Sequence, residues 1–337
     1  MNQIPSTPSP QEPARWALID GTGLLHRAHH AFATMKGPDG HATGVLHGTL
    51  NFVNKMMKGM NGPDHAIAIF DPRGGSFERQ ALYPAYKAQR PPRPEEITRQ
   101  EPWVHAFLKA SGIPVVSVMG VESDDVLAAI AKKECTDKKM AILSADKDMG
   151  QVVGGNIMWF KPDSVAEGGV ARMTTRAVID KFGVHPKQLR DFLALQGDTS
   201  DNLPGVEKVG EKTAAKLLNA FGSIDKMYEA LSDGQEGKQK LELAVGAATA
   251  KKIWVPLQEA KDWIHTMVSL VDLRVNTPVP RDLYANREPV NDQLMAEMRA
   301  EHGLPPWMGY FLPWQQERAA LMNQAKRTAP SAPAPKF

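Results

Sequence analysis

Short apolar segments alternate with longer segments of helical periodicity along the first half of the chain. Four apolar segments predict β-strands: WALID (16–20), HAIAIF (65–70), PVVSV (114–118) and MAILSA (140–145). Helical periodicity between them predicts helices over roughly 44–60, 95–111 and 123–134. This alternation is typical of an α/β fold, in which a mainly parallel central sheet is flanked by helices.

Strand signals become sparse after about residue 173, and helical periodicity dominates from there. We predict an α/β core over residues 15–172 and a smaller helical subdomain over 173–276. A C-terminal extension then occupies residues 277–337.

The two ends of the chain are rich in proline and small polar residues. Residues 1–14 and the tail KRTAPSAPAPKF are predicted to be disordered, because they contain too few large apolar side chains to form a core. The segment LPPWMGYFLPW (304–314) differs because it is rich in aromatic residues. These aromatics either pack back on the helical subdomain or bind a partner, and packing is the interpretation that we favour.

Composition limits the class of protein. A chain of 337 residues with 42% hydrophobic and 23% charged residues is typical of a globular protein with a large core. The net charge of +2 does not by itself indicate a nucleic-acid binder. The single cysteine, Cys135, excludes an internal disulfide and a thiolate metal cluster. The sequence shows neither a membrane-spanning segment nor the apolar core of a signal peptide, so we expect a cytoplasmic protein.

Aspartate ends or follows three of the predicted strands. Because ligands bind beyond the carboxyl ends of the strands in open parallel sheets, we expect these side chains at one edge. Two further motifs add carboxylates, GVESDD (120–125) after the third strand and GDTSDN (197–202) in the helical subdomain. The complete set is Asp20, Asp71, Glu122, Asp124, Asp125, Asp146, Asp148, Asp198 and Asp201.

Each carboxylate taken alone has an ordinary structural explanation. Asp20 begins a common type of turn, and Ser123 or Asp124 can cap a helix. Asp198 and Asp201 have the i, i+3 spacing of one helical face. Together, however, this many carboxylates at one edge would repel each other unless cations neutralised them. Oxygen ligands favour Mg²⁺ or Mn²⁺, and their number predicts two ions about 4 Å apart, as in phosphodiester hydrolysis.

Basic and aromatic side chains are interspersed between residues 73 and 99. Such a segment can contact the phosphates of a single strand and stack on its bases. The alternative is a solvated loop stiffened by the sequence PPRP (91–94). The residues concerned are Arg73, Arg79, Lys87, Arg90, Arg93 and Arg99, together with Tyr83 and Tyr86.

The segment LPGVEKVGEKTAAKLL (203–218) predicts a tight hairpin followed by a helix that starts near Glu211. Gly205 and Gly210 permit a turn whose backbone N–H groups can bind a phosphate, sometimes with a monovalent ion. A generic helix-turn-helix is the alternative, but the paired glycines with Lys208 and Lys212 favour contact with a duplex backbone. No base-reading element is evident, so we expect recognition of shape rather than of sequence.

Five segments in this order resemble the 5′-nuclease (flap endonuclease) family, which includes the N-terminal domain of bacterial DNA polymerase I and free-standing bacteriophage 5′-exonucleases. They are LIDGTGLLHRAHHAF, AIFDPRGGSFERQALYPAYKAQRPP, GVESDDVLA, LSADKDMGQVV and DFLALQGDTSDNLPGVEKVGEKTAAKLL. The resemblance covers residues 16–275. It implies a PIN-like nuclease core with a helical arch at about 73–99, and a helix–hairpin–helix element at about 192–220. It also implies a two-metal phosphodiesterase that removes 5′ flaps and RNA primers, with weaker 5′→3′ exonuclease activity.

The resemblance also assigns roles to residues. All nine carboxylates match the family's metal ligands, which implies two Mg²⁺ ions, for which Mn²⁺ can substitute. Arg79, Lys87 and Arg90 match arch residues that steady the scissile phosphate, and the hairpin matches an element that binds duplex backbone with K⁺. The nucleic-acid contacts predicted from pattern and resemblance together are Arg27, Arg73, Tyr83, Tyr86, Arg93, Gly205, Lys208, Gly210, Lys212 and Thr213.

The chain departs from the family at His26, His29 and His47, where relatives often carry tyrosine. Histidine rings at these positions either stack less well or make binding depend on pH near neutrality. The sequence shows no polymerase domain, so we expect the protein to work with a separate DNA polymerase. We also expect a monomer that does not bind a membrane.

Three other interpretations stay open. An inactive relative would bind flapped or forked DNA without cutting it, although the complete carboxylate set disfavours this. A ribonuclease H would act mainly on RNA primers, and backbone recognition does not distinguish the two substrates. A metal-dependent phosphatase for small molecules would leave the arch and the hairpin without a purpose.

Overall fold

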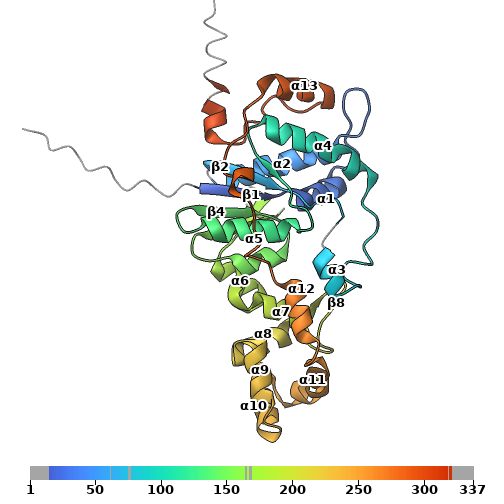
Figure 1. Cartoon of the computed structure of the whole chain (residues 1–337), viewed down its shortest axis with the longest axis vertical. Helices are drawn as coiled ribbons and strands as arrows, with labels where there is room; N and C mark the ends of the chain where they lie inside the picture. The colour runs from blue at the N-terminus through green and yellow to red at the C-terminus, as the bar shows by residue number, and fades with distance from the viewer. Residues whose placement is uncertain are drawn as a thin grey trace, which may run out of the picture.

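A six-stranded sheet lies at the centre of the computed structural model, which describes residues 15–320 apart from 61, 75, 76, 164, 167, 168 and 318 (Figure 1). The strands are β1 (Arg15–Asp20), β2 (His65–Ile69), β3 (Val115–Val116), β4 (Lys139–Leu143), β5 (Ile157–Pro162) and β6 (Val170–Met173). Their order is β3-β2-β1-β4-β5-β6, and all pairs are parallel except β5 with β6. The predicted mainly parallel sheet is confirmed.

The strand predictions fail at the two edges of the sheet. The pattern predicts a strand over 114–118, but only Val115–Val116 pair with β2, where Pro114 has no N–H to donate. The pattern also misses β5 and β6. β5 contains the apolar run IMWF before Lys161 and Pro162, but four apolar residues do not distinguish a strand from a helix, and β6 is only four residues long and contains an arginine.

Four helices cover the two faces of the sheet, namely α1 (Gly21–Ala31), α2 (Gly44–Gly59), α4 (Glu95–Ala110) and α5 (Ser123–Glu134). Successive side chains of a strand point to opposite faces, which divides the core in two. Ile19 and Leu143 belong to the cluster with side chains of α1, α2 and α4. Leu18 and Ile142 belong to the cluster with α5. Burial on both faces explains why these strands read as continuous apolar runs.

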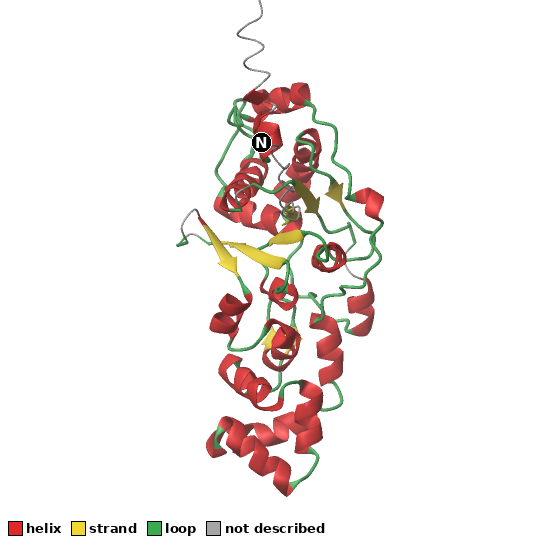
Figure 2. Ribbon diagram, turned by 90° about the vertical axis from the view of Figure 1, so that its left-hand side faces the viewer, coloured by secondary structure: helices red, strands yellow, loops and turns green. Residues whose placement is uncertain are grey.

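Helices dominate the part of the molecule that extends away from the sheet (Figure 2). They are α6 (Thr175–Phe182), α7 (Leu189–Gln196), α8 (Glu211–Phe221), α9 (Ile224–Leu231), α10 (Gln235–Val245), α11 (Ala247–Ala260) and α12 (Ile264–Val271). Two short strands, β7 (Gly197–Asp198) and β8 (Leu203–Pro204), pair between α7 and α8. The helix predicted to start near Glu211 begins at that residue.

After α12 the chain returns to the α/β core, where α13 (Asp292–His302) lies beside α4 (Figure 1). Leu304, Met308, Phe311 and Leu312 are buried in the cluster that includes side chains of α4. The segment 304–314 therefore packs, with Phe311 buried and Trp307 still 47% exposed, but its expected contact with the helical subdomain is wrong. The reason is that α13 docks on α4 and carries the following residues to that face.

Shorter helical elements are α3 (Phe77–Leu82), η1 (Lys147–Val152), η3 (Pro186–Gln188) and η4 (Arg281–Leu283). The segments with predicted disorder, 1–14 and the tail from Lys326, lie outside the described residues. Within the described part of 15–320, no helix combines the length and the apolar character that crossing a membrane requires.

Candidate metal centre and nucleic-acid interface

Carboxylates gather at the carboxyl ends of three adjacent strands. β2, β1 and β4 are neighbours in the sheet, and Asp71, Asp20 and Asp146 stand at or just beyond their ends. α5 begins at the same edge, with Glu122 as its N-cap residue. Asp71 joins two of these segments, because its carboxylate accepts the N–H of Ser123 at 2.6 Å.

Asp198 and Asp201 reach this edge from the helical part of the chain, but not from one helix. α7 ends before Gly197, whose φ of 81° does not continue a helix. Asp198 then lies in β7 and Asp201 in the turn that follows, so the expected shared helical face is wrong. Asp198 accepts a hydrogen bond from Lys147 at 2.8 Å, and Asp201 accepts one from Arg90 at 2.6 Å.

Asp20 is buried and held by two hydrogen bonds. The N–H of Gly23 donates to Oδ1 at 2.8 Å, and the hydroxyl of Ser144 donates to Oδ2 at 2.6 Å. A Cβ atom at Gly23 would lie 2.2 Å from Oδ2, so this approach requires glycine. Burial raises the pKa of Asp20 to about 6, because desolvation outweighs the two hydrogen bonds.

Glu122, Asp124 and Asp125 form the most compact carboxylate group. One oxygen from each lies within 4.8 Å of the others. The α5 dipole stabilises each negative charge by only about 0.3–1 kcal/mol, which does not offset the repulsion of three. Burial, followed by repulsion from Glu122, raises the pKa of Asp124 well above its usual value.

Asp148 lies close enough to the same centre to interact with Asp124 electrostatically. Burial raises its pKa well above the usual value, and repulsion from Asp146 and Asp124 adds to the effect. Its Oδ1 atom is buried and has no hydrogen-bond partner among the described residues. Buried oxygens without a donor, in a set that contains only carboxylates, fit a hard divalent cation.

Arg79 is buried beneath the compact group and uses all of its donors. Its two terminal nitrogens donate to both oxygens of Asp125 at 2.7 and 2.8 Å, and one also contacts Glu122 at 2.5 Å. The remaining donors reach the carbonyls of Leu270 and Asp272, each at 2.9 Å. With 2% of its surface exposed, Arg79 has no donor left for a scissile phosphate. The role implied by the resemblance therefore does not fit its position.

Tyr86 and Tyr83 also differ from the expected stacking residues. Tyr86 is 3% exposed, and its hydroxyl lies 3.0 Å from a carboxylate oxygen of Glu122 and 3.2 Å from one of Asp201. Tyr83 is half-buried and packs against the core cluster below α5. A ring in the position of Tyr86 is not available to a nucleic-acid base, so its predicted stacking role does not fit.

Lys87 and Arg90 face the carboxylates from the basic segment. Lys87 Nζ lies 2.7 Å from Glu122 and 3.8 Å from Asp201, and the Arg90 side chain remains 51% exposed while it pairs with Asp201. The backbone N–H of Lys87 donates to the Asp201 carbonyl at 2.9 Å. Burial opposes the ionisation of Glu122, but Lys87 and Arg79 outweigh it and lower its pKa.

A cavity of about 540 Å³ opens beside the carboxylates, between the loop that follows β2 and the basic segment. It combines cations that attract phosphate with carboxylates that bind metal. Arg93, on its wall, is held by two hydrogen bonds to Glu101 at 3.0 and 3.1 Å. The charged residues in its lining are Asp71, Arg73, Lys87, Arg90, Arg93 and Glu122.

The hairpin between α7 and α8 brings two backbones together. A Cβ atom at Gly205 would lie 2.2 Å from the backbone of Gln196, so only glycine fits there. α8 has no side-chain cap at Gly210, which leaves its first N–H groups available to an anion. Lys208 and Lys212 are exposed beside this turn, and Thr213 is partly buried within the first turn of α8.

Of the three histidines at which the resemblance implies a departure, His26, His29 and His47, the first lies on the wall of the cavity. His26 lines it, and burial followed by the charges of Arg93 and Arg90 lowers its pKa. Burial also lowers the pKa of His47, so the environment of both rings favours the neutral imidazole.

Arg27 and His29 lie on α1. The Arg27 guanidinium is 5.4 Å from the centre of the Phe52 ring, and its Nε atom is buried without a partner among the described residues. The ring of His29 lies 5.2 Å from that of His30. These contacts keep Arg27 close to the core surface of α2.

Comparison with known families identifies the chain. Residues 15–183 match the 5′-3′ exonuclease N-terminal resolvase-like domain, and residues 184–292 match the 5′-3′ exonuclease C-terminal SAM fold. The chain belongs to the 5′-3′ exonuclease family. It is 35% identical to the 5′-3′ exonuclease of Aquifex aeolicus, over 63% of this chain and 71% of that one. It is 31% identical to the 5′-3′ exonuclease of Buchnera aphidicola, over 78% of this chain and 87% of that one.

DNA polymerase I of Pseudomonas aeruginosa is 38% identical over 65% of this chain, which spans only 24% of the length of that protein. Two solved structures share the fold of this family member. The T5 5′-exonuclease with bound zinc matches with a TM-score of 0.58 at 20% identity, over 85% of this chain and 99% of that one. The catalytic core of Rad2 in complex with DNA substrate matches with a TM-score of 0.59 at 15% identity, over 92% of both chains.

Sequence reasoning missed three polar residues that hold the carboxylates in place. Ser144 donates to Asp20, Lys147 pairs with Asp198, and the hydroxyl of Thr22 accepts the backbone N–H of Asp71 at 2.8 Å. Each lies next to or two residues from a carboxylate of the set in the sequence. That proximity is the signal that could have found them.

Proposed function

We propose that this member of the family is a structure-specific 5′-nuclease that hydrolyses phosphodiesters at 5′ flaps and 5′ ends of DNA and in RNA primers. The observation that carries the proposal is the convergence of carboxylates from β1, α5, β7 and the loops after β2 and β4 beside a basic cavity. The relatives named 5′-3′ exonuclease support the reaction class. Their bacterial origin supports action in the cytoplasm of a bacterial cell.

Two Mg²⁺ ions, for which Mn²⁺ can substitute, fit the carboxylate set. Asp124 and Asp148 are the best candidates for direct ligands, because burial and neighbouring carboxylates raise their pKa values well above the usual range although Lys87, Arg79 and Lys147 act in the opposite direction. Both carboxylate oxygens of Asp125 already accept hydrogen bonds from Arg79. We therefore assign Asp125 the role of orienting the neighbouring carboxylates rather than that of a direct metal ligand. Bound ions of this kind lower the pKa of a water and stabilise a departing oxygen.

Lys87 and Arg90 supply the positive charge at the reacting phosphate. Both reach into the cavity and already pair with carboxylates, so in the complex they exchange these partners for phosphoryl oxygens. Hydrolysis adds water to phosphorus and releases the 3′ oxygen with a proton. The product strand carries a 5′-phosphate.

The hairpin after α7 holds the duplex next to the cut site. Free N–H groups at the start of α8 and the exposed Lys208 and Lys212 suit a phosphate backbone, with K⁺ as a further ligand of the turn. Lys208→Ala should weaken duplex binding and lower the slope of log affinity against log salt by about 1. An unchanged slope would remove Lys208 from the interface.

Arg79 acts as a positioning residue. It connects α3, at the base of the basic segment, with Asp125 in α5 and with two carbonyls at the C-terminal end of α12. The geometry of Glu122 and Asp125 therefore depends on the return of the chain from the helical part. This role replaces the phosphate contact suggested by the resemblance.

The main alternative is a flap-binding protein without turnover, and a preference for RNA primers is the second. The chain is proposed to act as a monomer beside a separate DNA polymerase. A cleavage assay on three labelled substrates with one shared duplex distinguishes these cases: a 5′ DNA flap, a nicked duplex and an RNA-primed duplex. We expect Mg²⁺-dependent release of the flap that EDTA abolishes. Tight binding without cleavage in Mg²⁺ or Mn²⁺ would contradict the nuclease.

A further inference from the structure

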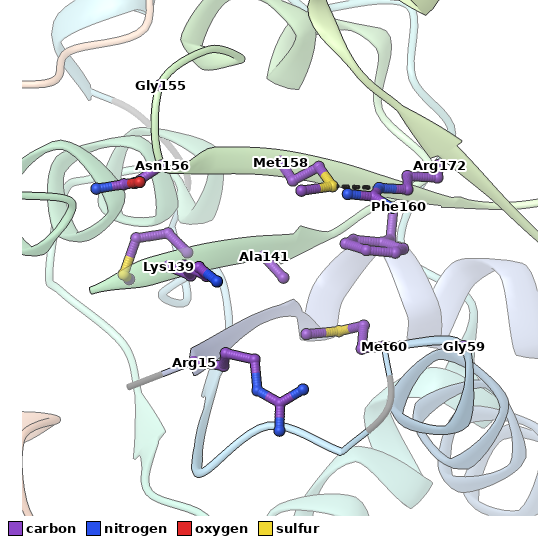
Figure 3. Close-up of a pocket in the computed structure, with 11 residues that line it drawn as sticks. Arg15, Gly59, Met60, Lys139, Ala141, Gly155, Asn156, Met158, Phe160 and Arg172 are labelled. Carbon is purple, nitrogen blue, oxygen red and sulfur yellow. Dashed lines mark hydrogen bonds between the residues drawn. The ribbon is translucent and has the colours of Figure 1, made fainter. Parts of the chain in front are cut away.

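A second pocket, of about 340 Å³, lies at the opposite end of the same strands (Figure 3). The carboxylate centre stands beyond the carboxyl ends of β1 and β4, whereas this pocket is lined by residues at their beginnings. It therefore lies one strand length away from the candidate metal centre. None of the carboxylates assigned above lines it.

Strand register explains why its lining residues share one face of the sheet. Arg15 of β1 and Lys139 of β4 are partners in a parallel pair, so their side chains point to the same side. Alternation along β4 and β5 places Ala141, Met158 and Phe160 on that side too. Arg172 of β6 is the partner of Phe160 and completes the row.

α2 covers this face but ends at Gly59, which leaves the beginnings of the strands uncovered. Ala141, with its small side chain, lies in the middle of the exposed floor, between Lys139 and Phe160 (Figure 3). Met60 closes the side next to α2. The pocket is thus the corner of the sheet that neither α2 nor a large side chain fills.

The pocket carries positive charge without carboxylates in its lining. Arg15, Lys139 and Arg172 are its charged residues. Across the described parts of the chain, neither arginine takes part in an ion pair, and the Arg172 guanidinium contacts only the sulfur of Met158, at 2.6 Å. The C-terminal end of α2 contributes about half a negative charge, which offsets only part of the charge of the two arginines.

The spacing of the charges indicates the shape of the ligand. Arg15 and Lys139 stand on adjacent strands and form one pole. Arg172 stands two strands beyond β4, so the poles are separated by about 10–14 Å of mostly apolar floor. One anion cannot reach both poles, but an elongated molecule with an anionic end and a flat apolar body can.

We propose that this pocket binds a nucleoside monophosphate. The phosphate pairs with Arg15 and Lys139, because guanidinium and ammonium groups suit its oxygens. The base lies over Phe160 and the methionine sulfurs, and Arg172 stacks on it or donates to its edge. The volume of the pocket suits a ligand of this size. The proposal does not depend on the nuclease activity.

Isothermal titration calorimetry with deoxyadenosine 5′-monophosphate in EDTA tests this site without metal at the catalytic edge. We expect binding, with inorganic phosphate and deoxyadenosine each at least about tenfold weaker. Arg15→Gln should weaken nucleotide and phosphate binding alike. Arg172→Gln should weaken only the nucleotide, and Ala141→Met should block it by filling the floor.

Two matched variants keep the test specific. Arg99→Gln removes an exposed arginine elsewhere and should not change this affinity, and Arg90→Gln, which removes a cation of the catalytic cavity, reports any nucleotide binding there. Loss of binding in Arg90→Gln but not in Arg15→Gln would overturn the proposal, as would no binding at millimolar nucleotide to folded protein. Equal affinity for inorganic phosphate would overturn the nucleotide class. An unphosphorylated single-stranded oligonucleotide that binds as tightly and depends on Arg15 would replace it with a nucleic-acid surface.

Discussion

The same strands carry opposite charges at their two ends. β1 begins with Arg15 and ends with Asp20, and β4 begins with Lys139 and leads to Asp146. At the carboxyl end Asp20, Glu122 and Asp125 are buried, Asp146 is exposed, and hydrogen bonds such as the five of Arg79 connect the charges. At the amino end they are half-buried or exposed, and the two arginines have no ion pair among the described residues.

This difference shows how the free-energy cost of a charged side chain depends on whether it is buried or exposed. Burial makes a carboxylate depend on a partner, since the desolvation of the charged form has to be offset. The family's metal ions are that partner in our account. An exposed charge costs little without a partner and is free to meet a ligand from solution. Substitutions at the two ends should therefore differ in their effect on stability.

The largest expected effect is at Arg79. Arg79→Ala leaves Asp125 buried and unpaired, so the free energy of unfolding should fall by about 3–5 kcal/mol in urea titrations. Arg99→Ala is the control, because Arg99 is exposed and pairs with Glu96, and its loss should cost less than about 1 kcal/mol. Arg79→Lys should recover part of the stability. Its cleavage activity should still need a higher Mn²⁺ concentration than the wild-type protein to reach half of its maximum. Equal stability of the two alanine variants would contradict the buried network.

The next effect is the pH dependence caused by Asp20. Its pKa of about 6 in the fold exceeds the unfolded value of 3.8, so folding favours the protonated form. The metal-free protein should lose about 3 kcal/mol of stability as pH rises from about 4 to about 6. Asp20→Asn should remove this share of the loss and leave the shares of Asp124 and Asp148, whereas Asp262→Asn, at an exposed position, should retain the whole loss. Urea unfolding in EDTA across this range is the measurement, and identical curves for both variants would exclude Asp20 as the source.

The smallest effect belongs to the amino end. Arg172→Gln should change the free energy of unfolding by no more than about 0.5 kcal/mol, because the side chain is exposed and unpaired. The same measurement as for Arg79 applies, with wild-type protein as the reference. A loss above about 2 kcal/mol would mean that the two ends do not differ as described.

Residue type and order were enough to predict the carboxylate edge and the parallel sheet. Asp20, Asp71 and Asp146 stand at or near the ends of strands whose apolar runs are unambiguous. The short edge strand β6 gave no such signal, because four residues with one arginine do not show a period. The i, i+3 spacing of Asp198 and Asp201 predicted a shared helical face that does not exist, because α7 ends before them, at its C-cap Gly197.

Burial was the property that the sequence could not supply. Arg79, Lys87 and Arg90 lie in one basic segment, yet only Arg79 donates to the carbonyls of Leu270 and Asp272 at the end of α12. Those partners are about 190 residues away in the chain. A local sequence pattern cannot predict such a long-range contact. The contact of Tyr86 with Asp201 and the packing of 304–314 on α4 are long-range contacts of the same kind.

The central claim is that the carboxylate edge performs metal-dependent cleavage, and Asp146→Asn on a labelled 5′ DNA flap tests it most directly. Single-turnover cleavage in Mg²⁺ and flap binding in Ca²⁺ should be measured side by side, with Asp137→Asn, at an exposed carboxylate, as the control. Asp146→Asn should lower the cleavage rate by about 10²–10³-fold or more, while flap affinity should stay within a few fold. Cleavage by Asp146→Asn at the rate of the Asp137→Asn control would contradict the claim.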